Sequence, residues 1–285
     1  MLTKTPYRCP GDDSVIHQAC SGLLSQWTGP VDEHVTRTSL GETHLIGVGP
    51  AAGRPIVVLA GGDLPAAGLR ELAGSFDTST RVTLVDLPGL PGSSACERPD
   101  SNVHAAYGRW LTEILDALQL ERTPVLGLGW AASAAAAISD VDRVGKLVLA
   151  APLGLVPRAR WHRGVIAGLQ WRNEPSIENT ERYLRSLAGE GFEPDDSTVR
   201  WSCRMGAYCR SQSGMPRISG ALWKRWRGRD VEIVVGEQDP LVQVSALRRM
   251  GAEIDAHVAV VPGVGHLIAV EAPTAVARAG LAPSH

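Results

Sequence analysis

Short apolar runs recur along the chain, and each is bounded by Gly, Pro or Asp. They cover residues 56–60, 81–86, 124–128, 147–151, 231–236 and 257–262. Runs this short that are rich in Val, Ile and Leu are typical of strands buried on both faces. We therefore predict a sheet whose two faces are both covered by other elements.

Helical patterns separate these runs, most clearly at 102–118, where apolar residues recur at steps of three and four. Strands that alternate with helices predict the α/β class, with a parallel sheet built from βαβ units. Residues 34–48 instead predict antiparallel edge strands that turn at Leu40-Gly41. Residues 1–30 show little periodicity, and we expect an irregular lead-in there.

The alternation stops between residues 155 and 228. This stretch has helical segments near 176–189 and 195–210 and holds five of the eight tryptophans, at positions 161, 171, 201, 223 and 226. We predict one core in two parts, residues 1–154 and 229–285, with a helical cap of residues 155–228 inserted over the carboxyl edge of the sheet. The tryptophans are expected to form mainly the core of the cap.

The overall charge is nearly balanced, because 28 Lys+Arg face 30 Asp+Glu for a net charge of −2. This balance excludes a uniformly basic nucleic-acid-binding protein. Residues 158–229, however, carry 14 Lys+Arg against 7 Asp+Glu. The basic cap favours an anionic or carrier-tethered small-molecule substrate, although an arginine-rich solvated face would give the same count.

Cysteine usage and apolar run lengths limit the remaining classes. The five cysteines are an odd number without C-x-x-C spacing, which argues against a disulfide framework and against a zinc site. The first residues lack the apolar segment of a signal peptide, and no run of about 18 apolar residues occurs. We expect a cytoplasmic protein without a metal, a cofactor or a membrane partner.

Six segments follow one another as the landmarks of the α/β-hydrolase superfamily do. They read VVLAGGD, VTLVDLPGLPGSS, PVLGLGWAASAAAA, KLVLAAP, VEIVVGEQDPLV and VPGVGHLIAVEAP. Over residues 34–281 the chain resembles that superfamily, although the cap matches only in position. The resemblance implies an eight-stranded, mostly parallel, doubly wound sheet with an inserted helical cap.

The same resemblance assigns catalytic residues to positions of this sequence, but the nucleophile is missing. It assigns the acid to Asp239 and the base to His266. The nucleophile elbow normally reads G-x-S-x-G, but here Gly129 holds the position of the nucleophile and offers no reactive side chain. A glycine adopts the positive φ of an elbow without steric cost. The oxyanion hole falls on backbone N–H groups of Trp130 and of Gly62 or its neighbour Asp63.

Three other features of the sequence compete with this interpretation. Gly127-x-Gly129-x-x-Ala132 also fits a dinucleotide fingerprint, but the next strand lacks the acidic residue that would hold a ribose. Ser133 lies one turn into the following helix, where a hydroxyl usually bonds a backbone carbonyl. Cys96, in the loop after DLPGLPGSS, is another candidate nucleophile, although a lone cysteine is usually inert packing.

A base and an oxyanion hole without a nucleophile suit proton abstraction beside a carbonyl. The sequence therefore favours a cofactor-independent lyase, dehydratase or cyclase acting on a carbonyl-containing small molecule, with a role in secondary metabolism. One alternative is a hydrolase in which His266 activates water directly on an ester, thioester or C–C bond. A second alternative is a non-catalytic ligand-binding protein of the same fold.

Overall fold

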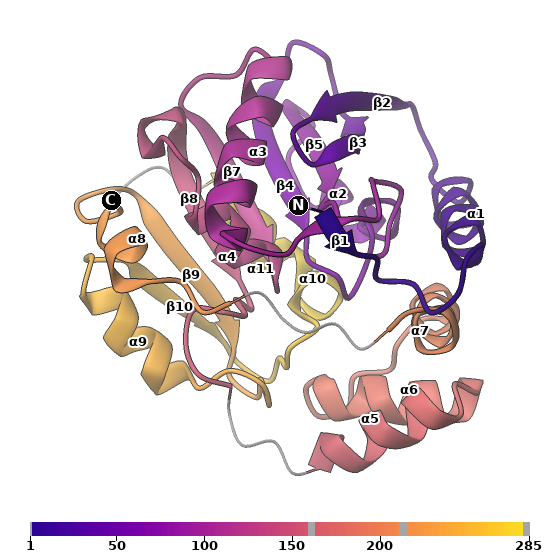
Figure 1. The fold of residues 1–285 in the computed structure, drawn as a ribbon. Coiled ribbons are helices and arrows are strands. Elements are labelled where there is room, and N and C mark those ends of the chain that lie inside the picture. The colour runs from indigo at the N-terminus through magenta and orange to yellow at the C-terminus, as the bar shows by residue number, and fades with distance from the viewer. Residues whose placement is uncertain (1, 159–162, 211–215, 282–285) are drawn as a thin grey trace.

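The computed structural model describes residues 2–158, 163–210 and 216–281 and contains a sheet of eight strands in the order β10-β9-β8-β7-β4-β5-β3-β2 (Figure 1). Neighbours among β10, β9, β8, β7, β4 and β5 run parallel, whereas β3 is antiparallel to β5 and β2 is antiparallel to β3. The strands are β2 (Val31–Thr38), β3 (Gly41–Val48), β4 (Arg54–Ala60), β5 (Thr80–Asp86), β7 (Thr123–Leu128), β8 (Val144–Ala150), β9 (Val231–Gly236) and β10 (His257–Val261). A separate small ladder joins β1 (Leu2–Lys4) to β6 (Arg98–Pro99).

Helices cover both faces of the sheet and enclose two separate buried apolar clusters. One cluster includes side chains of α3 (Val103–Ala117), α4 (Ala131–Ala136) and α9 (Val244–Ala252). The other includes side chains of α1 (Asp12–Leu24), α2 (Arg70–Gly74), α10 (Ile268–Glu271) and α11 (Pro273–Leu281). Short 3₁₀ turns lie at Ala66–Gly68 and Val141–Arg143. The doubly wound α/β-hydrolase fold expected from the resemblance is thus confirmed.

The strands agree with the apolar runs to within a few residues. β3 and β2 form the predicted antiparallel edge, and their turn lies at Ser39-Leu40 just before Gly41, which has a φ of 96°. Helix α3 matches the predicted 102–118 segment. Its Trp110 is fully buried, and the indole Nε1 donates a hydrogen bond of 2.9 Å to Thr43 Oγ1. The period of the apolar positions therefore indicated the correct element type throughout the sheet.

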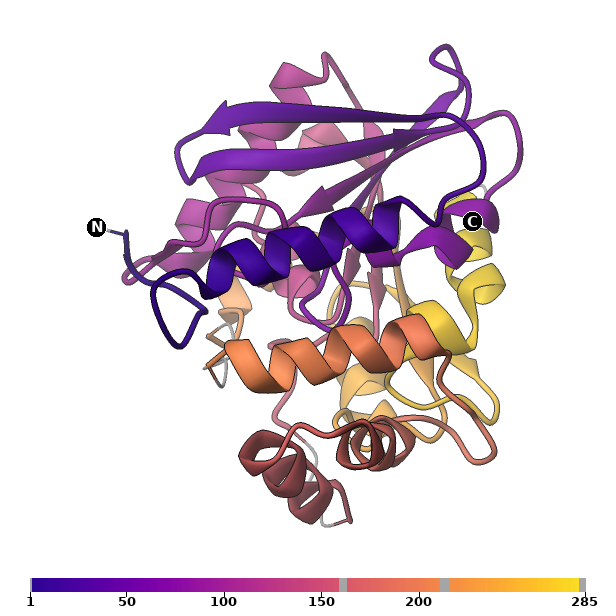
Figure 2. The same ribbon diagram turned by 90° about the vertical axis from the view of Figure 1, so that its right-hand side faces the viewer.

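The prediction of an irregular lead-in over residues 1–30 is wrong, because α1 occupies Asp12–Leu24. This helix buries only Ile16, Ala19 and Cys20, so its apolar stripe is narrow. It lies against α7 (Asp196–Tyr208) and against the 3₁₀ turn at Ala66–Gly68, both distant in the sequence (Figure 2). A helix stabilised mainly by such packing has little local signal.

Three of the described helices between β8 and β9 lie beyond the carboxyl ends of the parallel strands, and we refer to them as the cap (Figure 1). They are α5 (Arg163–Asn173), α6 (Ile177–Leu187) and α7. The predicted segments at 176–189 and 195–210 correspond to α6 and α7, and each begins at a capping side chain. Ser176 Oγ accepts from the Asn179 N–H, and the Asp195 carboxylate accepts from two amides of α7.

Helix α8 (Gly220–Lys224), later in the same insertion, packs with elements of the sheet domain. The indole of Trp223 donates to the Met250 carbonyl on α9, and that of Trp226 donates to the Ala136 carbonyl on α4. These two tryptophans therefore do not fit the expectation that they belong to a cap core, and Trp161 lies outside the described residues. In the part of the chain that the structure covers, every helix is too short or too polar to cross a membrane.

Candidate active site

The loops after β9 and β10 bring Asp239 and His266 together at the carboxyl edge of the sheet. His266 Nδ1 lies 2.8 Å from Asp239 Oδ2, and both residues are buried. The other carboxylate oxygen of Asp239 accepts from the N–H groups of Leu241 and Val242 at 2.8 and 3.0 Å. This arrangement fixes the carboxylate and assigns the ring proton to Nδ1, so that Nε2 is the atom left for chemistry.

His266 is also held from the cap. Its backbone N–H donates to the Leu187 carbonyl at the end of α6, with a distance of 2.8 Å. Beside it, Glu271 Oε2 accepts from the N–H of Gly265 at 2.8 Å and from that of Gly189 at 2.6 Å. We call these two bonds the Glu271 bridge. It ties the His266 loop to the segment that follows α6, so the base has partners in both the sheet domain and the cap.

The predicted elbow is a tight turn between β7 and α4. Gly129 has a φ of 48°, its N–H donates to Ala150 O at 3.0 Å, and its carbonyl accepts from Leu153 N–H at 2.9 Å. The positive φ expected of an elbow residue is therefore present. Of the two amides assigned to the oxyanion hole, that of Trp130 donates to Gly61 O at 3.3 Å, whereas Gly62 lines the pocket.

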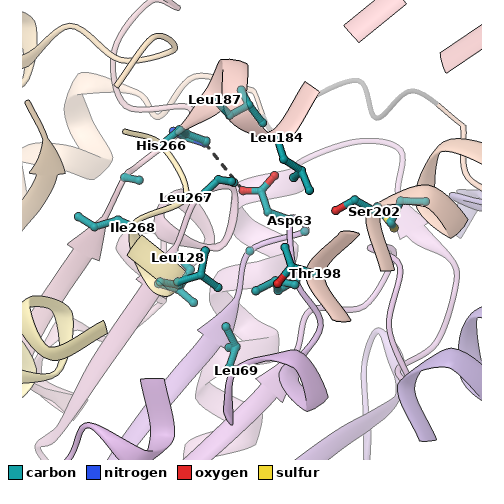
Figure 3. A pocket seen from close by; sticks show the side chains of 18 of the residues that line it. Asp63, Leu69, Leu128, Leu184, Leu187, Thr198, Ser202, His266, Leu267 and Ile268 are labelled. Atoms are coloured by element: carbon teal, nitrogen blue, oxygen red, sulfur yellow. Dashed lines mark ion pairs between the residues drawn. The ribbon is translucent and has the colours of Figure 1, made fainter. Parts of the chain in front are cut away.

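A pocket lies between this edge of the sheet and the cap (Figure 3). Its volume is about 80 Å³, which is enough for several waters or a small acyl group. The wall is largely apolar, and its polar side chains are few, as is usual for small-molecule sites. The lining includes Leu69, Leu128, Tyr183, Leu184, Leu187, Thr198, Ser202, Leu267 and Ile268 together with Gly62, Gly129 and His266.

The Asp63 carboxylate is the residue of this site that sequence reasoning missed, because only its backbone amide had been considered. Asp63 Oδ2 lies 3.8 Å from His266 Nε2, and Figure 3 shows the two side chains facing each other. A Cβ atom built on Gly129 would lie 3.5 Å from the same oxygen. The available signal was an acidic residue directly after the Gly-Gly pair that ends a strand, in a chain without an elbow nucleophile.

The surroundings of Asp63 shift its ionisation. Asp63 lines the pocket, and 47% of its side-chain surface is open. Removal from bulk water raises the pKa of Asp63, and the charge of Asp239 adds to this rise. The charges of His266 and the exposed Arg158 oppose the rise without cancelling it.

The pKa of His266 is raised, although two opposing effects act on it. Burial alone lowers the pKa of an imidazole, because it penalises the charged form. The charge and the hydrogen bond of Asp239 raise it, the charge of Asp63 raises it further, and Arg158 lowers it. The carboxylates outweigh burial, so the imidazolium is stabilised between Asp239 and Asp63.

The two other candidate nucleophiles are not among the residues that line this pocket. Ser133 is buried in α4, and its hydroxyl donates to the Leu153 carbonyl at 3.1 Å, as expected for a serine inside a helix. Cys96 is half-buried. Among the described residues no group of three or more His, Cys, Asp or Glu side chains is arranged to hold a metal ion.

Several known proteins are similar to this chain. The chain is 33% identical over 131 residues to a 2-hydroxy-6-oxononadienedioate/2-hydroxy-6-oxononatrienedioate hydrolase of Cupriavidus pinatubonensis, a match that covers 42% of this chain and 43% of that protein. It is 21% identical over 277 residues to the carboxylesterase YbfK of Bacillus subtilis, covering 90% and 89% of the two chains. The naproxen esterase structure from Bacillus subtilis superposes with a TM-score of 0.78 at 18% identity, over 95% of this chain and 97% of that one.

The first of these relatives thus matches over less than half of its own length, and the esterase structure at 18% identity shows the fold alone. The sequence pattern of the Alpha/beta hydrolase family, by contrast, matches residues 56–279. That range includes most of β4, the elbow and both loops that carry Asp239 and His266. The chain belongs to the Alpha/beta hydrolase family.

Proposed function

We propose that this protein is a hydrolase of a small carbonyl compound, an ester, a thioester or a C–C bond beside a carbonyl, in which His266 activates water. The observation that carries the proposal is the Nε2 atom of His266. It is buried at the pocket and has no hydrogen-bond partner among the described residues, while Asp239 holds Nδ1. In its neutral form, an imidazole held in this way has a free nitrogen that can take a proton from water.

The relatives change the balance between the functions that the sequence left open. Sequence reasoning favoured a lyase, dehydratase or cyclase, with hydrolysis as the alternative. The relatives named above are a dienedioate hydrolase and a carboxylesterase, so hydrolysis now has the stronger support. The missing elbow nucleophile removes the usual serine route but not the base.

The charge near the pocket supports a substrate with an anionic group. The guanidinium of Arg158 lies 5.9 Å from the centre of the Trp130 ring, next to the elbow, and its charge acts on both Asp63 and His266. Several other arginines of the cap already pair with acidic neighbours, Arg182 with Glu178 and Arg200 with Asp196 among them. Arg158 is therefore the cap-side cation that we assign to substrate binding.

The test is turnover in ¹⁸O-labelled water with short-chain p-nitrophenyl esters and short-chain acyl thioesters. We expect one labelled oxygen in the released acid, and we expect turnover to disappear in His266→Ala. The matched control is His257→Ala, because His257 is an exposed residue at the opposite end of β10. A rearranged or eliminated product without label would exclude hydrolysis, and full activity of His266→Ala would exclude this base.

A further inference from the structure

The strongest unassigned feature is the Asp63 carboxylate, because it lies where a reactive side chain is missing. Gly62 has a φ of 100°, a backbone conformation that glycine adopts readily, and it precedes Asp63 at the end of β4. Asp63 Oδ2 then lies 3.5 Å from the position that a Cβ of residue 129 would occupy. A carboxylate from β4 thus reaches the space that the elbow after β7 leaves empty.

Asp239, His266 and Asp63 lie next to one another in the order of the three members of a catalytic triad. Asp239 bonds one ring nitrogen at 2.8 Å, and Asp63 Oδ2 lies 3.8 Å from the other. An orienting acid, a base and a nucleophile in sequence is the general signature of an activated nucleophile, and the last distance is often longer in a free enzyme. Here the third member comes from a different strand than in the usual arrangement.

Asp86, at the end of the neighbouring strand β5, shows what a structural aspartate looks like in this protein. Its oxygens accept from the N–H groups of Ala66 at 2.7 Å and Ser93 at 2.9 Å. The hydrogen bond that Asp63 makes to Trp201 instead involves its backbone, where its carbonyl accepts from the indole at 2.9 Å. No described residue donates a hydrogen bond to its carboxylate, so the reactive oxygens face the pocket.

We propose that Asp63 is the nucleophile of this enzyme and forms an acyl intermediate on its side chain. The inference rests on the proposed hydrolysis and changes one step of it, because the activated water attacks the acylated Asp63 instead of the substrate. It also accounts for Gly129. A hydroxyl at position 129 that pointed toward His266 would compete with Asp63 Oδ2 for the same space.

The steps balance as follows. The Asp63 carboxylate attacks the acyl carbon, the bond to the leaving group breaks, and the leaving group departs with the electron pair and takes the proton from the His266 imidazolium. Neutral His266 then removes a proton from water as this water adds to the mixed anhydride. The anhydride opens to the product acid and the free Asp63 carboxylate, the imidazolium is restored, and the remaining proton leaves with the acid.

This route selects a class of substrate. A carboxylate is expelled from the first adduct far more readily than an alkoxide, so the reaction proceeds only if the leaving group is itself stabilised. Thiolates, phenolates and enolates meet this condition. The pocket of about 80 Å³ with leucine walls fits a short apolar acyl group. The expected substrates are therefore thioesters and aryl or enol esters with small acyl chains.

The experiment uses His266→Gln, which removes the base needed for the second step. With p-nitrophenyl butyrate, whose leaving group needs no proton, we expect a burst of about one equivalent of nitrophenol. The intact protein should gain the mass of one butyryl group, and borohydride reduction followed by peptide mass spectrometry should convert Asp63 to homoserine. The double variant Asp63→Asn/His266→Gln should show neither the burst nor the added mass.

Two further variants complete the test. Asp63→Asn alone should reduce wild-type turnover by about 10³-fold or more. Asp196→Asn, a carboxylate on the surface of α7 that is 91% exposed, should leave turnover unchanged. Thermal melting shows whether each variant is folded, and the acyl-mass measurement on His266→Gln does not depend on Asp63 variants.

The outcomes separate the two proposals. If wild type incorporates ¹⁸O into product while His266→Gln gives no burst and no acylated Asp63, the nucleophile proposal is overturned and the proposed hydrolysis remains. Acylation of a residue other than Asp63 overturns it in the same way. If wild type hydrolyses neither the ester nor the thioester, the proposed function fails, and the role of Asp63 fails with it.

Discussion

The two halves of the pocket wall are built differently. On the side of β9 and β10, Asp239 and His266 are fixed by backbone amides, by each other and by the Glu271 bridge. On the side of β4 and β7, Gly129 has no side chain and the Asp63 carboxylate has no hydrogen-bond donor among the described residues. A group that transfers protons needs a fixed position. A nucleophile must in addition keep its attacking atom open to the substrate.

The largest effect is expected on the fixed side. His266→Ala removes the group that protonates a thiolate leaving group and then accepts a proton from water, so it should lower both kcat and kcat/KM by roughly 10⁴-fold. Because the ring is buried and bonded to Asp239, His266→Gln is the better-folded variant for the same measurement. Steady-state kinetics with a thioester checks the prediction. A loss of less than about 10-fold would show that His266 and Asp63 do not act together in the reaction.

On the side of β4 and β7, one substitution should reduce activity and a second substitution should restore part of it. Gly129→Ser places a hydroxyl beside Asp63 Oδ2, so we expect activity to fall by roughly 10- to 100-fold. Combining it with Asp63→Ala removes the crowding and restores the usual serine arrangement, and we expect the double variant to be more active than either single variant. Additive losses in this cycle would show that residues 63 and 129 do not share one space.

A smaller effect concerns the influence of the Asp63 charge on the pKa of His266. The negative charge of Asp63 stabilises the imidazolium, so Asp63→Asn should lower the pKa of His266, leaving Asp239 to raise it and Arg158 to lower it. NMR titration of the imidazole, assigned with His266→Gln, measures this shift. An unchanged or higher value would contradict the facing geometry.

The same titration has a consequence for stability. In the folded protein the pKa of His266 is raised, so folding favours its charged form. This contribution is complete below the unfolded value of about 6.5 and disappears as the pH rises through the folded value. In Asp63→Asn it should disappear at a lower pH, which thermal melts across neutral pH can detect.

Glu271→Gln is expected to have the smallest effect on turnover and the clearest effect on the free energy of unfolding. This change weakens two bonds from a carboxylate to backbone N–H groups, and we expect a loss of about 1–3 kcal/mol in the free energy of unfolding. Denaturant unfolding measures it. Ser133→Ala is the matched control in a buried helix, and its expected cost is about 1 kcal/mol because one neutral hydrogen bond is lost.

How far the sequence predicted this molecule depended on the range of the interactions involved. The strands, α3 and the positions of Asp239, His266 and Gly129 followed from local patterns and from the order of the landmarks. Helix α1 was missed because its partner α7 lies far along the chain. The Asp63 carboxylate was missed for a similar reason, since nothing in VVLAGGD shows that its last side chain crosses to the loop after β7.

The Glu271 bridge has one more consequence, for the timing of substrate entry. The His266 N–H bonds to Leu187 at the end of α6, and the Gly189 bond of the bridge joins Glu271 to the segment just after α6, whereas the Gly265 bond stays within the sheet domain. A movement of the cap away from this end would break the two bonds to Leu187 and Gly189, while the bond from His266 Nδ1 to Asp239 would remain. On the α6 side, opening the cap would therefore remove part of the support of the His266 loop, so we expect the base to be held most firmly when the cap is closed.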